Sequence, residues 1–258
     1  MTPIDIAVAG STGRMGRALI EAVLAAADLR LCAALEQSGH PQIGRKVGEL
    51  VGTPGEIAIS ADVAAAVKGA DVLIDFTRPA GTLAHLEMCR RSGTRIVVGT
   101  TGFEASQRDA IAAAGRDIAI VFAPNMSVGV NVMLKLLSVA AAALREAYDV
   151  EIMEAHHRHK IDAPSGTALR MGEVVAQAQG RSLDECAVYD RHGVTGERKG
   201  GTIGFAALRG GDLVGDHTAL FAGAGERLEI THRASSRANY AQGALRAARF
   251  LMTQARGV

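Results

Sequence analysis

Short apolar segments alternate with helical patterns over the first two-thirds of the chain. Residues Ile4–Ala9 form an almost continuous apolar run, as in a buried strand. From Arg14 the apolar residues Met15, Leu19 and Val23 recur every four positions, the spacing of a helix that lies on a sheet. Further strands are expected at residues 29–36, 71–76, 95–98 and 118–122, and further helices at 62–67, 81–91 and 104–114. Nearly continuous apolar strands that alternate with helices predict a parallel sheet covered on both faces.

The pattern changes after Asn125. A long apolar helix is expected over residues 128–145, then a strand at 149–155 and a helix from Ser165 to about Gly180, a glycine that fits a C-terminal cap. Three short strands with glycine-rich turns between them are expected to be antiparallel, at residues 202–209, 213–222 and 226–233.

A last helix, at residues 239–254, is expected to return to the first domain. We therefore predict an α/β fold with an N-terminal doubly wound, Rossmann-type parallel sheet and a C-terminal mixed α+β domain. The first, dinucleotide-binding domain would comprise residues 1–126 with 237–258, and the second residues 127–236.

Composition narrows the class of protein. The 258 residues are 48% apolar, enough for one large or two modest cores, and 30 glycines suit an α/β protein with many tight turns better than a helical bundle. The formal net charge is +1, Trp is absent and aromatic residues make up 3%, so neither a basic face nor stacking platforms for nucleic acid are expected.

The cysteines and the apolar stretches bear on the compartment. Cys32, Cys89 and Cys186 are odd in number and widely spaced, which argues against a disulfide framework and a zinc ribbon. No basic segment followed by an apolar one precedes the first strand, so no signal peptide is expected. The uncharged residues 118–134 are interrupted by Pro124 and suit a strand, a turn and a buried helix better than a membrane span. We expect a soluble, cytoplasmic protein.

A glycine-rich turn directly follows the first strand and opens the first helix: Gly10-Ser11-Thr12-Gly13-Arg14-Met15-Gly16. Glycines there allow a tight turn, approach of the backbone to a pyrophosphate and close packing of helix on strand, while the N–H groups of the helix face the anion. The spacing GxxGxxG is a looser signal than GxGxxG, and an ordinary strand–turn–helix could use the same glycines. Glu36, 20 residues after Gly16, stands where an acid accepts hydrogen bonds from the adenosine ribose. Together they predict a nicotinamide dinucleotide site.

The choice of cofactor depends on the surroundings of Glu36. Its carboxylate would repel a ribose 2′-phosphate, the next residue, Gln37, is neutral, and Arg14 could compensate only in part. We therefore expect NADH to be preferred, with NADPH possible.

Three of the eight histidines, His156, His157 and His159, lie within four residues, directly before Lys160. Such spacings can ligate zinc, but Arg158 and Lys160 would oppose a dication, so no metal is expected. A solvated polar loop is a second interpretation. The third is a proton-transfer site for an anionic substrate, which uses imidazoles and cations together.

The residues that follow favour proton transfer. Ser165 is a good N-cap for the next helix, so the first N–H groups of that helix point outward. Gly166 leaves room for an anion, and the Thr167 hydroxyl adds a donor. A helix N-terminus beside Lys160 and three histidines is suited to holding a carboxylate.

These residues resemble a known family. The run His156–Lys160, followed by Asp162-Ala163-Pro164-Ser165-Gly166-Thr167, is similar to the signature of the dihydrodipicolinate reductases of the diaminopimelate route to lysine. The resemblance covers nearly the whole chain, including residues 75–79, 99–103, 125–131, 201–205 and 229–232. It implies reduction of 4-hydroxy-tetrahydrodipicolinate (dihydrodipicolinate) to tetrahydrodipicolinate with NAD(P)H, and a homotetramer assembled by C-terminal sheets.

The resemblance also implies roles for individual residues. His156 would be the acid/base residue and Lys160 the proton donor to a substrate contacted by His157, Gly166 and Thr167. The nicotinamide site would be lined by Gly99, Thr100, Thr101, Ala123, Pro124, Asn125 and Met126. Gln37 departs from the family, in which many bacterial members carry Arg to meet a 2′-phosphate.

The implied substrate is a cyclic dicarboxylate with a conjugated C=N–C=C system. Hydride would pass from the nicotinamide to ring C4, building negative charge toward the ring nitrogen and C3, while Lys160 delivers a proton that His156 replenishes. Two other functions stay open: another Rossmann oxidoreductase of aspartate-family metabolism, and a non-catalytic NAD(H)-sensing regulator. An aspartate-semialdehyde dehydrogenase would need a nucleophilic Cys in a suitable context, and a regulator would need a basic DNA-binding module; the sequence shows neither.

Overall fold

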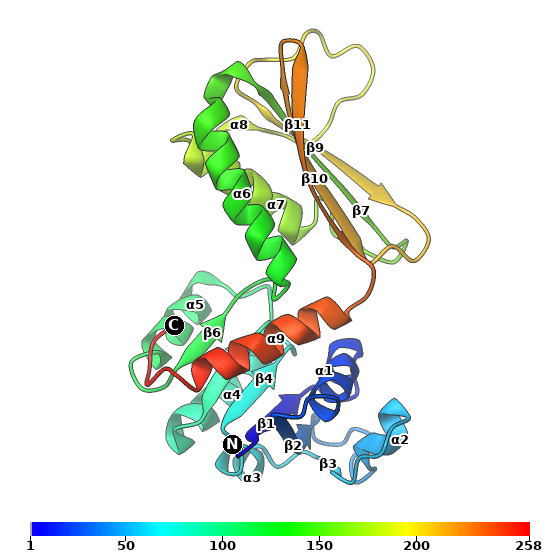
Figure 1. Ribbon diagram of the computed structural model, residues 1–258, viewed down its shortest axis with the longest axis vertical. Helices are drawn as coiled ribbons and strands as arrows, with labels where there is room; N and C mark the ends of the chain where they lie inside the picture. Colours follow the sequence, from blue (N-terminus) through cyan, green and yellow to red (C-terminus); the bar gives the residue numbers. More distant parts are fainter. Residues whose placement is uncertain (1) are drawn as a thin grey trace. The chain divides into compact units, whose positions relative to one another are not determined.

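The computed structural model describes residues 2–258, the side chain of Glu146 excepted. The chain divides into two compact units: the residues up to Ser127 together with Arg237–Val258, and Val128–Ser236. Each unit is built around its own sheet (Figure 1).

The first unit contains a six-stranded parallel sheet. Its strands lie side by side in the order β3-β2-β1-β4-β5-β6, and every neighbouring pair is parallel. This order reverses between β1 and β4, so the crossover helices fall on both faces, which confirms the predicted doubly wound fold. The strands are β1 (Ile4–Ala9), β2 (Leu29–Leu35), β3 (Ile59–Ser60), β4 (Val72–Asp75), β5 (Arg95–Val98) and β6 (Ile120–Phe122).

Side chains of the strands alternate between two apolar cores. On β1, Ile6 and Val8 pack on one face of the sheet and Ala7 and Ala9 on the other, and all four are buried, which explains the uninterrupted apolar run. The first core is completed by α1 (Arg14–Leu24), α2 (Val47–Val51) and α9 (Ala238–Leu251), and the second by α3 (Val63–Lys68), α4 (Pro79–Ser92) and α5 (Ala105–Ala114).

The second unit has a five-stranded mixed sheet with two helices on one face, and Figure 1 shows these helices, α6 and α7, side by side. The strands, in the order β11-β10-β7-β9-β8, are β7 (Asp149–His156), β8 (Ala187–Val188), β9 (Ile203–Arg209), β10 (Gly215–Gly223) and β11 (Glu226–Ala234). The helices are α6 (Val128–Leu144), the 3-10 turn Arg145–Ala147, α7 (Gly166–Ala178) and the short α8 (Leu183–Cys186).

The expected antiparallel pairing of the last three strands is confirmed for β10 with β11, but β9 does not pair with β10. β10 is antiparallel to both β11 and β7, but β9 pairs in parallel with β7 and β8. β7 therefore lies between β9 and β10, and the Gly210-Gly211 turn joins strands that are not neighbours. A glycine-rich turn predicts a change of direction, but not which strand will lie alongside. Within residues 2–258, no helix combines the length and the apolar composition needed to cross a bilayer.

The C-terminal helix α9 packs against α1 and against β4, β5 and β6 of the first unit. Gly243 makes this close approach possible, because a Cβ atom at this position would lie 1.7 Å from the carbonyl oxygen of Met126. A methyl group there would push the helix away from the segment that follows β6.

We predict that Gly243→Ala lowers the free energy of unfolding by about 1–3 kcal/mol, the usual cost of overpacking, despite the better helix propensity of alanine. Denaturant unfolding of the full chain measures this. The matched control is Gly69→Ala, where the nearest atom to a new Cβ is 3.7 Å away. Equal stability of the two variants would contradict the prediction.

Candidate active site

The glycine turn joins β1 to α1 at the carboxyl edge of the parallel sheet. Gly10 has a φ of +67°, a conformation that favours glycine, and a Cβ on Gly16 would lie 2.1 Å from the Gly10 carbonyl oxygen. Gly13 is the N-cap of α1 and has no side chain to occupy the first N–H groups of the helix. The turn therefore offers backbone donors to an anion, as a dinucleotide pyrophosphate requires.

The other predicted residues of this turn differ in how they are presented. Ser11 is fully buried beneath the turn, and Met15 packs against the core on the α1 face. Arg14 is exposed, so its side chain can reach a ligand at the helix N-terminus.

Glu36 follows β2 and is held in place by the glycine turn itself. The Thr12 hydroxyl donates to Oε2 of Glu36 at 2.7 Å, and the backbone N–H of Gln37 donates to Oε1 at 2.9 Å. Burial opposes ionisation of this carboxyl, but the hydrogen bonds from Thr12 and Gln37 outweigh it and hold its pKa below the ordinary value. Glu36 is thus a preorganised acceptor for a diol, as a ribose binder should be.

The two segments expected to line a nicotinamide follow the neighbouring strands β5 and β6. The N–H of Ala123 donates to the carbonyl of Val98 at 3.1 Å, which places residues 123–126 beside residues 99–101. A Cβ on Gly99 would lie 2.2 Å from the ring of Phe76, so only glycine lets the backbone cross there. Thr101 and Pro124 are exposed, whereas Thr100 and Met126 are buried.

A buried acid, Asp75, supports these loops, and the sequence analysis did not name it as a site residue. The fully buried Asp75 carboxylate accepts from the Thr77 N–H at 2.8 Å, from the Thr82 hydroxyl at 3.1 Å and from Nδ1 of His85 at 2.7 Å. Burial opposes its ionisation, but the hydrogen bond and the charge of His85 outweigh burial and lower the pKa of Asp75. The Thr82 and Thr100 hydroxyl oxygens are 2.8 Å apart, so Thr100 belongs to this buried network.

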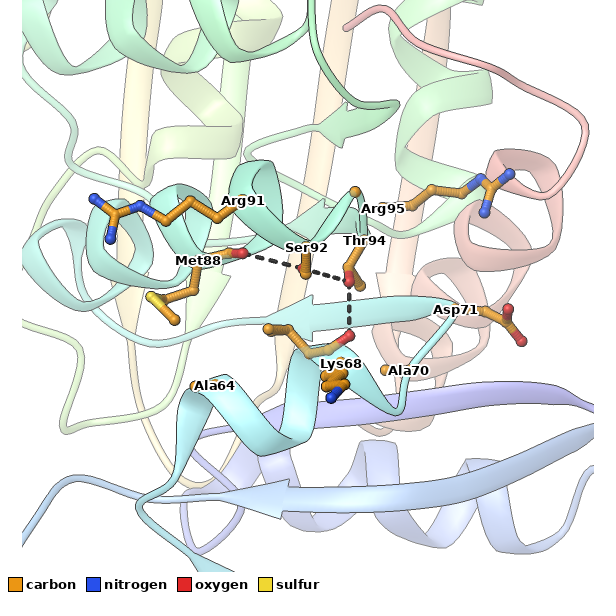
Figure 2. A pocket seen from close by; sticks show the side chains of 11 residues that line it. Ala64, Lys68, Ala70, Asp71, Met88, Arg91, Ser92, Thr94 and Arg95 are labelled. Atoms are coloured by element: carbon orange, nitrogen blue, oxygen red, sulfur yellow. Dashed lines mark hydrogen bonds between the residues drawn. The ribbon is translucent and has the colours of Figure 1, made fainter.

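A surface pocket of about 500 Å³ lies at the opposite edge of the same sheet, where Asp71 precedes β4 and Arg95 begins β5 (Figure 2). Figure 2 shows Arg91 and Arg95 pointing away from each other, while the Ser92 and Thr94 hydroxyls are hydrogen-bonded at 2.7 Å. Ligands of open α/β sheets bind outside the carboxyl ends of the strands, so this pocket is not the dinucleotide site.

The histidine loop of the second unit follows β7 and is held by the turn after β9. The N–H of Gly210 donates to the His156 carbonyl at 3.0 Å, and the N–H of Lys160 donates to the His157 carbonyl at 3.1 Å. Nζ of Lys160 lies 2.8 Å from Oδ1 of Asp162. Burial opposes ionisation of Asp162, but Lys160 outweighs it and lowers the pKa of this carboxyl. Nζ of Lys160 is therefore paired with a half-exposed carboxylate in the same loop.

The loop ends at the N-terminus of α7, and the predicted N-cap is confirmed. The Ser165 hydroxyl accepts from the N–H of Ala168 at 3.2 Å and lies 3.0 Å from Nε2 of His217. Gly166 is exposed, with open space where a Cβ would lie, and Thr167 is half-buried beside it. The structure thus brings Lys160, the histidine loop and the first N–H groups of α7 together within one unit.

Three further residues belong to this site: Glu154, which the sequence places just before the histidine cluster, and Arg209 and His217, which no local pattern indicates. Glu154, two residues before His156, is buried and accepts from Nδ1 of His156 at 2.6 Å and from the Arg209 guanidinium at 2.7 Å. His217 packs edge-on against His156, with ring centroids 5.0 Å apart. Burial and the neighbouring His156 lower the pKa of His217 to about 4, so His217 is neutral near pH 7. Arg209 and His217 are more than 50 residues from His156, and only the fold brings them near.

The positions of the three clustered histidines can be compared with what a zinc site requires. Among residues 2–258, apart from the Glu146 side chain, no three His, Cys, Asp or Glu side chains gather closely enough to hold a metal ion. The rings of His157 and His159 are 6.2 Å apart, and Nδ1 of His156 faces Glu154. The described side chains of the cluster are therefore not arranged as a set of metal ligands.

The chain matches one protein family over nearly its whole length. Residues 4–126 match the N-terminal part of dihydrodipicolinate reductase and residues 129–258 its C-terminal part. The chain is 66% identical over 258 residues to the 4-hydroxy-tetrahydrodipicolinate reductase of Nitrosomonas europaea, covering 100% of this chain and 96% of that protein. It is 61% identical over 251 residues to the enzyme of that name from Burkholderia pseudomallei, covering 97% and 94%.

A solved structure of the same family has a similar fold. The dipicolinate-bound dihydrodipicolinate reductase of Paenisporosarcina sp. TG-14 superposes with a TM-score of 0.79 at 26% identity, covering 100% of this chain and 97% of that one. Aspartate semialdehyde dehydrogenase II of Vibrio cholerae has a TM-score of 0.55 at 9% identity, covering 97% and 99%, a likeness of fold alone. Family matches over both halves and the identity to these relatives establish that the chain belongs to the dihydrodipicolinate reductase family.

Proposed function

We propose that the chain reduces 4-hydroxy-tetrahydrodipicolinate to tetrahydrodipicolinate with NAD(P)H, in the diaminopimelate route to lysine. The 4-hydroxyl group leaves as water, which gives the conjugated ring, and that ring then accepts a hydride and a proton. The observation that carries this proposal is the joining of Lys160, the histidine loop and the Ser165-capped N-terminus of α7 in one unit. Relatives 61–66% identical over almost the whole chain carry the name of this enzyme. The unpaired state of Cys32, Cys89 and Cys186 suits the reducing cytoplasm, where we place the protein.

The residues of the second unit bind the dicarboxylate and supply the proton. The first N–H groups of α7 and the Thr167 hydroxyl donate to one carboxylate beside Gly166, and His157 contacts the substrate from the loop. Lys160 exchanges Asp162 for a substrate carboxylate and delivers a proton to ring C3, and His156 then returns a proton to Lys160. The positive charge of Lys160 stabilises the negative charge that builds toward the ring nitrogen.

The residues of the first unit fit a dinucleotide. The N–H groups at the start of α1 face the pyrophosphate, Glu36 accepts from the adenosine ribose, and residues 99–101 and 123–126 orient the nicotinamide. When bound, the dihydronicotinamide supplies the hydride for ring C4. Because Thr12 and Gln37 hold Glu36 as a carboxylate, we infer that NADH is preferred and that a 2′-phosphate is repelled.

A cysteine-dependent dehydrogenase is a weaker alternative on this structure. Burial raises the pKa of the Cys32 thiol to about 11 and that of Cys89 to about 12, and it also raises the pKa of Cys186. Nucleophilic cysteines are thiolates near neutral pH, so none of the three is suited to attack an aldehyde.

We also infer self-association into a homotetramer through the second unit. On the sheet face turned away from α6 and α7, Met153 is 37% and Leu208 64% exposed, with Ala206 directly opposite Met153. A second exposed apolar row lies on α6, at Val128, Val132, Leu136 and Val139. Apolar surface of this extent in a monomer is typical of an interface.

Replacing Lys160 by Ala is expected to lower kcat by about a hundredfold to ten-thousandfold, the usual contribution of a positioned proton donor. NADH affinity should change little, because Lys160 belongs to the second unit. The assay follows loss of nicotinamide absorbance, with substrate made in situ by the preceding synthase from pyruvate and aspartate semialdehyde. The control is Lys68→Ala, in the surface pocket at the amino edge of the sheet. An unchanged kcat for Lys160→Ala would refute its role, and absence of turnover in the parent chain would refute the function.

For the cofactor, we expect a lower KM for NADH than for NADPH, and we expect Glu36→Gln to reduce this discrimination roughly tenfold, about 1.4 kcal/mol. The physical reason is loss of charge repulsion toward a 2′-phosphate. Steady-state kinetics with both cofactors measure it. Glu49→Gln, which removes an exposed carboxylate on α2 that is paired with Arg45, is the control. A KM for NADPH far below that for NADH in the parent chain would overturn the inference.

Light scattering during size-exclusion chromatography should give four times the 26.8 kDa of one chain. Ala206→Glu should dissociate the assembly, since it places a charge on the open sheet face. Ala112→Glu, at an exposed position of α5, should leave the mass unchanged. A monomeric parent chain, or a tetramer of unchanged stability in Ala206→Glu, would contradict the proposed interface.

A further inference from the structure

The carboxylate of Glu154 receives four hydrogen bonds from three segments. Its Oε2 accepts from Nδ1 of His156 at 2.6 Å and from one Arg209 nitrogen at 2.7 Å. Its Oε1 accepts from the N–H of Ser165 at 3.0 Å and from the other Arg209 nitrogen at 2.7 Å. The side chain is wholly buried on β7, so this carboxylate has no contact with bulk water.

We propose that Glu154 is a positioning residue that keeps a proton on Nδ1 of His156 and thereby confines proton exchange to Nε2. This inference rests on the proposed function, in which His156 is the acid/base residue. Glu154 itself touches neither substrate nor cofactor and acts only through His156.

The hydrogen-bonding capacity of the two groups leads to this assignment. A carboxylate only accepts, so the imidazole nitrogen that faces it must carry a hydrogen whether the ring is neutral or charged. In the neutral ring the lone pair is then on Nε2. A ring turned by 180° would place a carbon atom against the carboxylate and lose the bond.

The opposite side of the imidazole is left open by a glycine. A Cβ on Gly215, the first residue of β10, would lie 3.0 Å from Nε2 of His156 and 3.4 Å from its Cδ2. The nearby His217 does not compete for the proton, because burial and His156 lower its pKa to about 4. Of this pair of rings, His156 is therefore the one that can exchange a proton, and Nε2 is its exchanging nitrogen.

Arg209 keeps Glu154 in the form that the proposal needs. Burial opposes ionisation of Glu154, but hydrogen bonds from Arg209 and His156 outweigh it and lower the pKa of this carboxyl. A protonated Glu154 could donate to Nδ1 and allow the other tautomer. The same guanidinium also donates to the Asp162 carbonyl at 2.6 Å, so it joins Glu154 to the segment that holds Lys160.

A purely structural role for Glu154 makes a different prediction. Its bonds to Ser165 and Arg209 join β7 to α7 and β9, and their loss would lower stability without a specific effect on His156. The tautomer of His156 distinguishes the two roles.

Glu154→Gln is the test because the amide keeps the size of the side chain and has one accepting oxygen. Arg209 donates to both oxygens, so it does not decide the orientation of the amide. The Ser165 N–H on the Oε1 side can only donate, whereas Nδ1 of His156 on the Oε2 side can become an acceptor, so the amide oxygen should turn toward Ser165. The NH2 group then faces Nδ1 of His156, which can accept only if the ring changes to the Nε2–H tautomer. We expect this change, with a fall in kcat between about tenfold and about ten-thousandfold, as when the orienting carboxylate of an imidazole is lost.

Nitrogen-15 NMR of the full chain with labelled histidine reports the tautomer, and the His156 signals are assigned by their loss in His156→Gln. Glu151→Gln is the matched control, since Glu151 lies on the same strand and is also bound by arginine, in its case by Arg191 and Arg198, and it has no bond to His156. This control should keep the parent tautomer and a kcat within about twofold, as for a part-exposed ion pair.

The outcomes distinguish a failure of the positioning role of Glu154 from a failure of the proposed function. An Nε2–H tautomer of neutral His156 in the parent chain overturns the positioning role of Glu154, even if Glu154→Gln does not fold. Parent tautomer and parent kcat in folded Glu154→Gln overturn it too, while a large loss of kcat in His156→Gln leaves the proposed function standing. Full activity of His156→Gln, in contrast, refutes the role of His156 in the proposed function.

Discussion

One buried carboxylate, that of Glu154, determines how the second unit presents its chemistry. It lies on β7, directly opposite His217 on β10, and it is bound by Arg209 at the end of β9 and by the N–H of Ser165 before α7. An uncompensated charge in this position would cost several kcal/mol, so the three segments that supply its donors, the ends of β7 and β9 and the residues before α7, stabilise one another here. The order of the sheet, with β7 between β9 and β10, is therefore also the order that completes this network.

The first unit assembles the predicted dinucleotide site at its sheet edge mainly through backbone geometry. Parallel strands bring their carboxyl ends to one edge, so Gly10, Glu36, Gly99 and Ala123 follow β1, β2, β5 and β6 at that edge without any long-range side-chain recognition. The close approach of Gly16 to Gly10 then fixes α1 on the sheet. Its ligand is an anion, and backbone N–H groups suit an anion without any buried charge of the protein.

The first unit depends on local backbone geometry and the second on contacts between distant residues. This difference explains which features could be predicted from the sequence. Buried parallel strands and the glycine turn leave local patterns, so the doubly wound fold and the family follow from residues near one another in the chain. The parallel pairing of β9 with β7 leaves no such pattern, because strand partners are chosen by packing across the whole unit. The same is true of Arg209 and His217, whose partners are about 50 residues away. Thr12 stood inside the predicted turn, but its bond to Glu36 needed the register of β1 and β2.

Both units contain a buried carboxylate that is bound by a histidine and by a backbone N–H. The two carboxylates differ in the groups that provide their remaining hydrogen bonds. Asp75 on β4 and Glu154 on β7 are buried carboxylates, each bound by Nδ1 of a histidine, at 2.7 and 2.6 Å, and by the N–H of a residue in the following loop, at 2.8 and 3.0 Å. Asp75 is completed by threonine hydroxyls and supports loops that only need a fixed shape. Glu154 is completed by an arginine, which helps to keep it ionised beside His156. In the function that we propose, His156 changes its charge, and a carboxylate that must stay an acceptor through such a change is stabilised by a permanent cation, here Arg209.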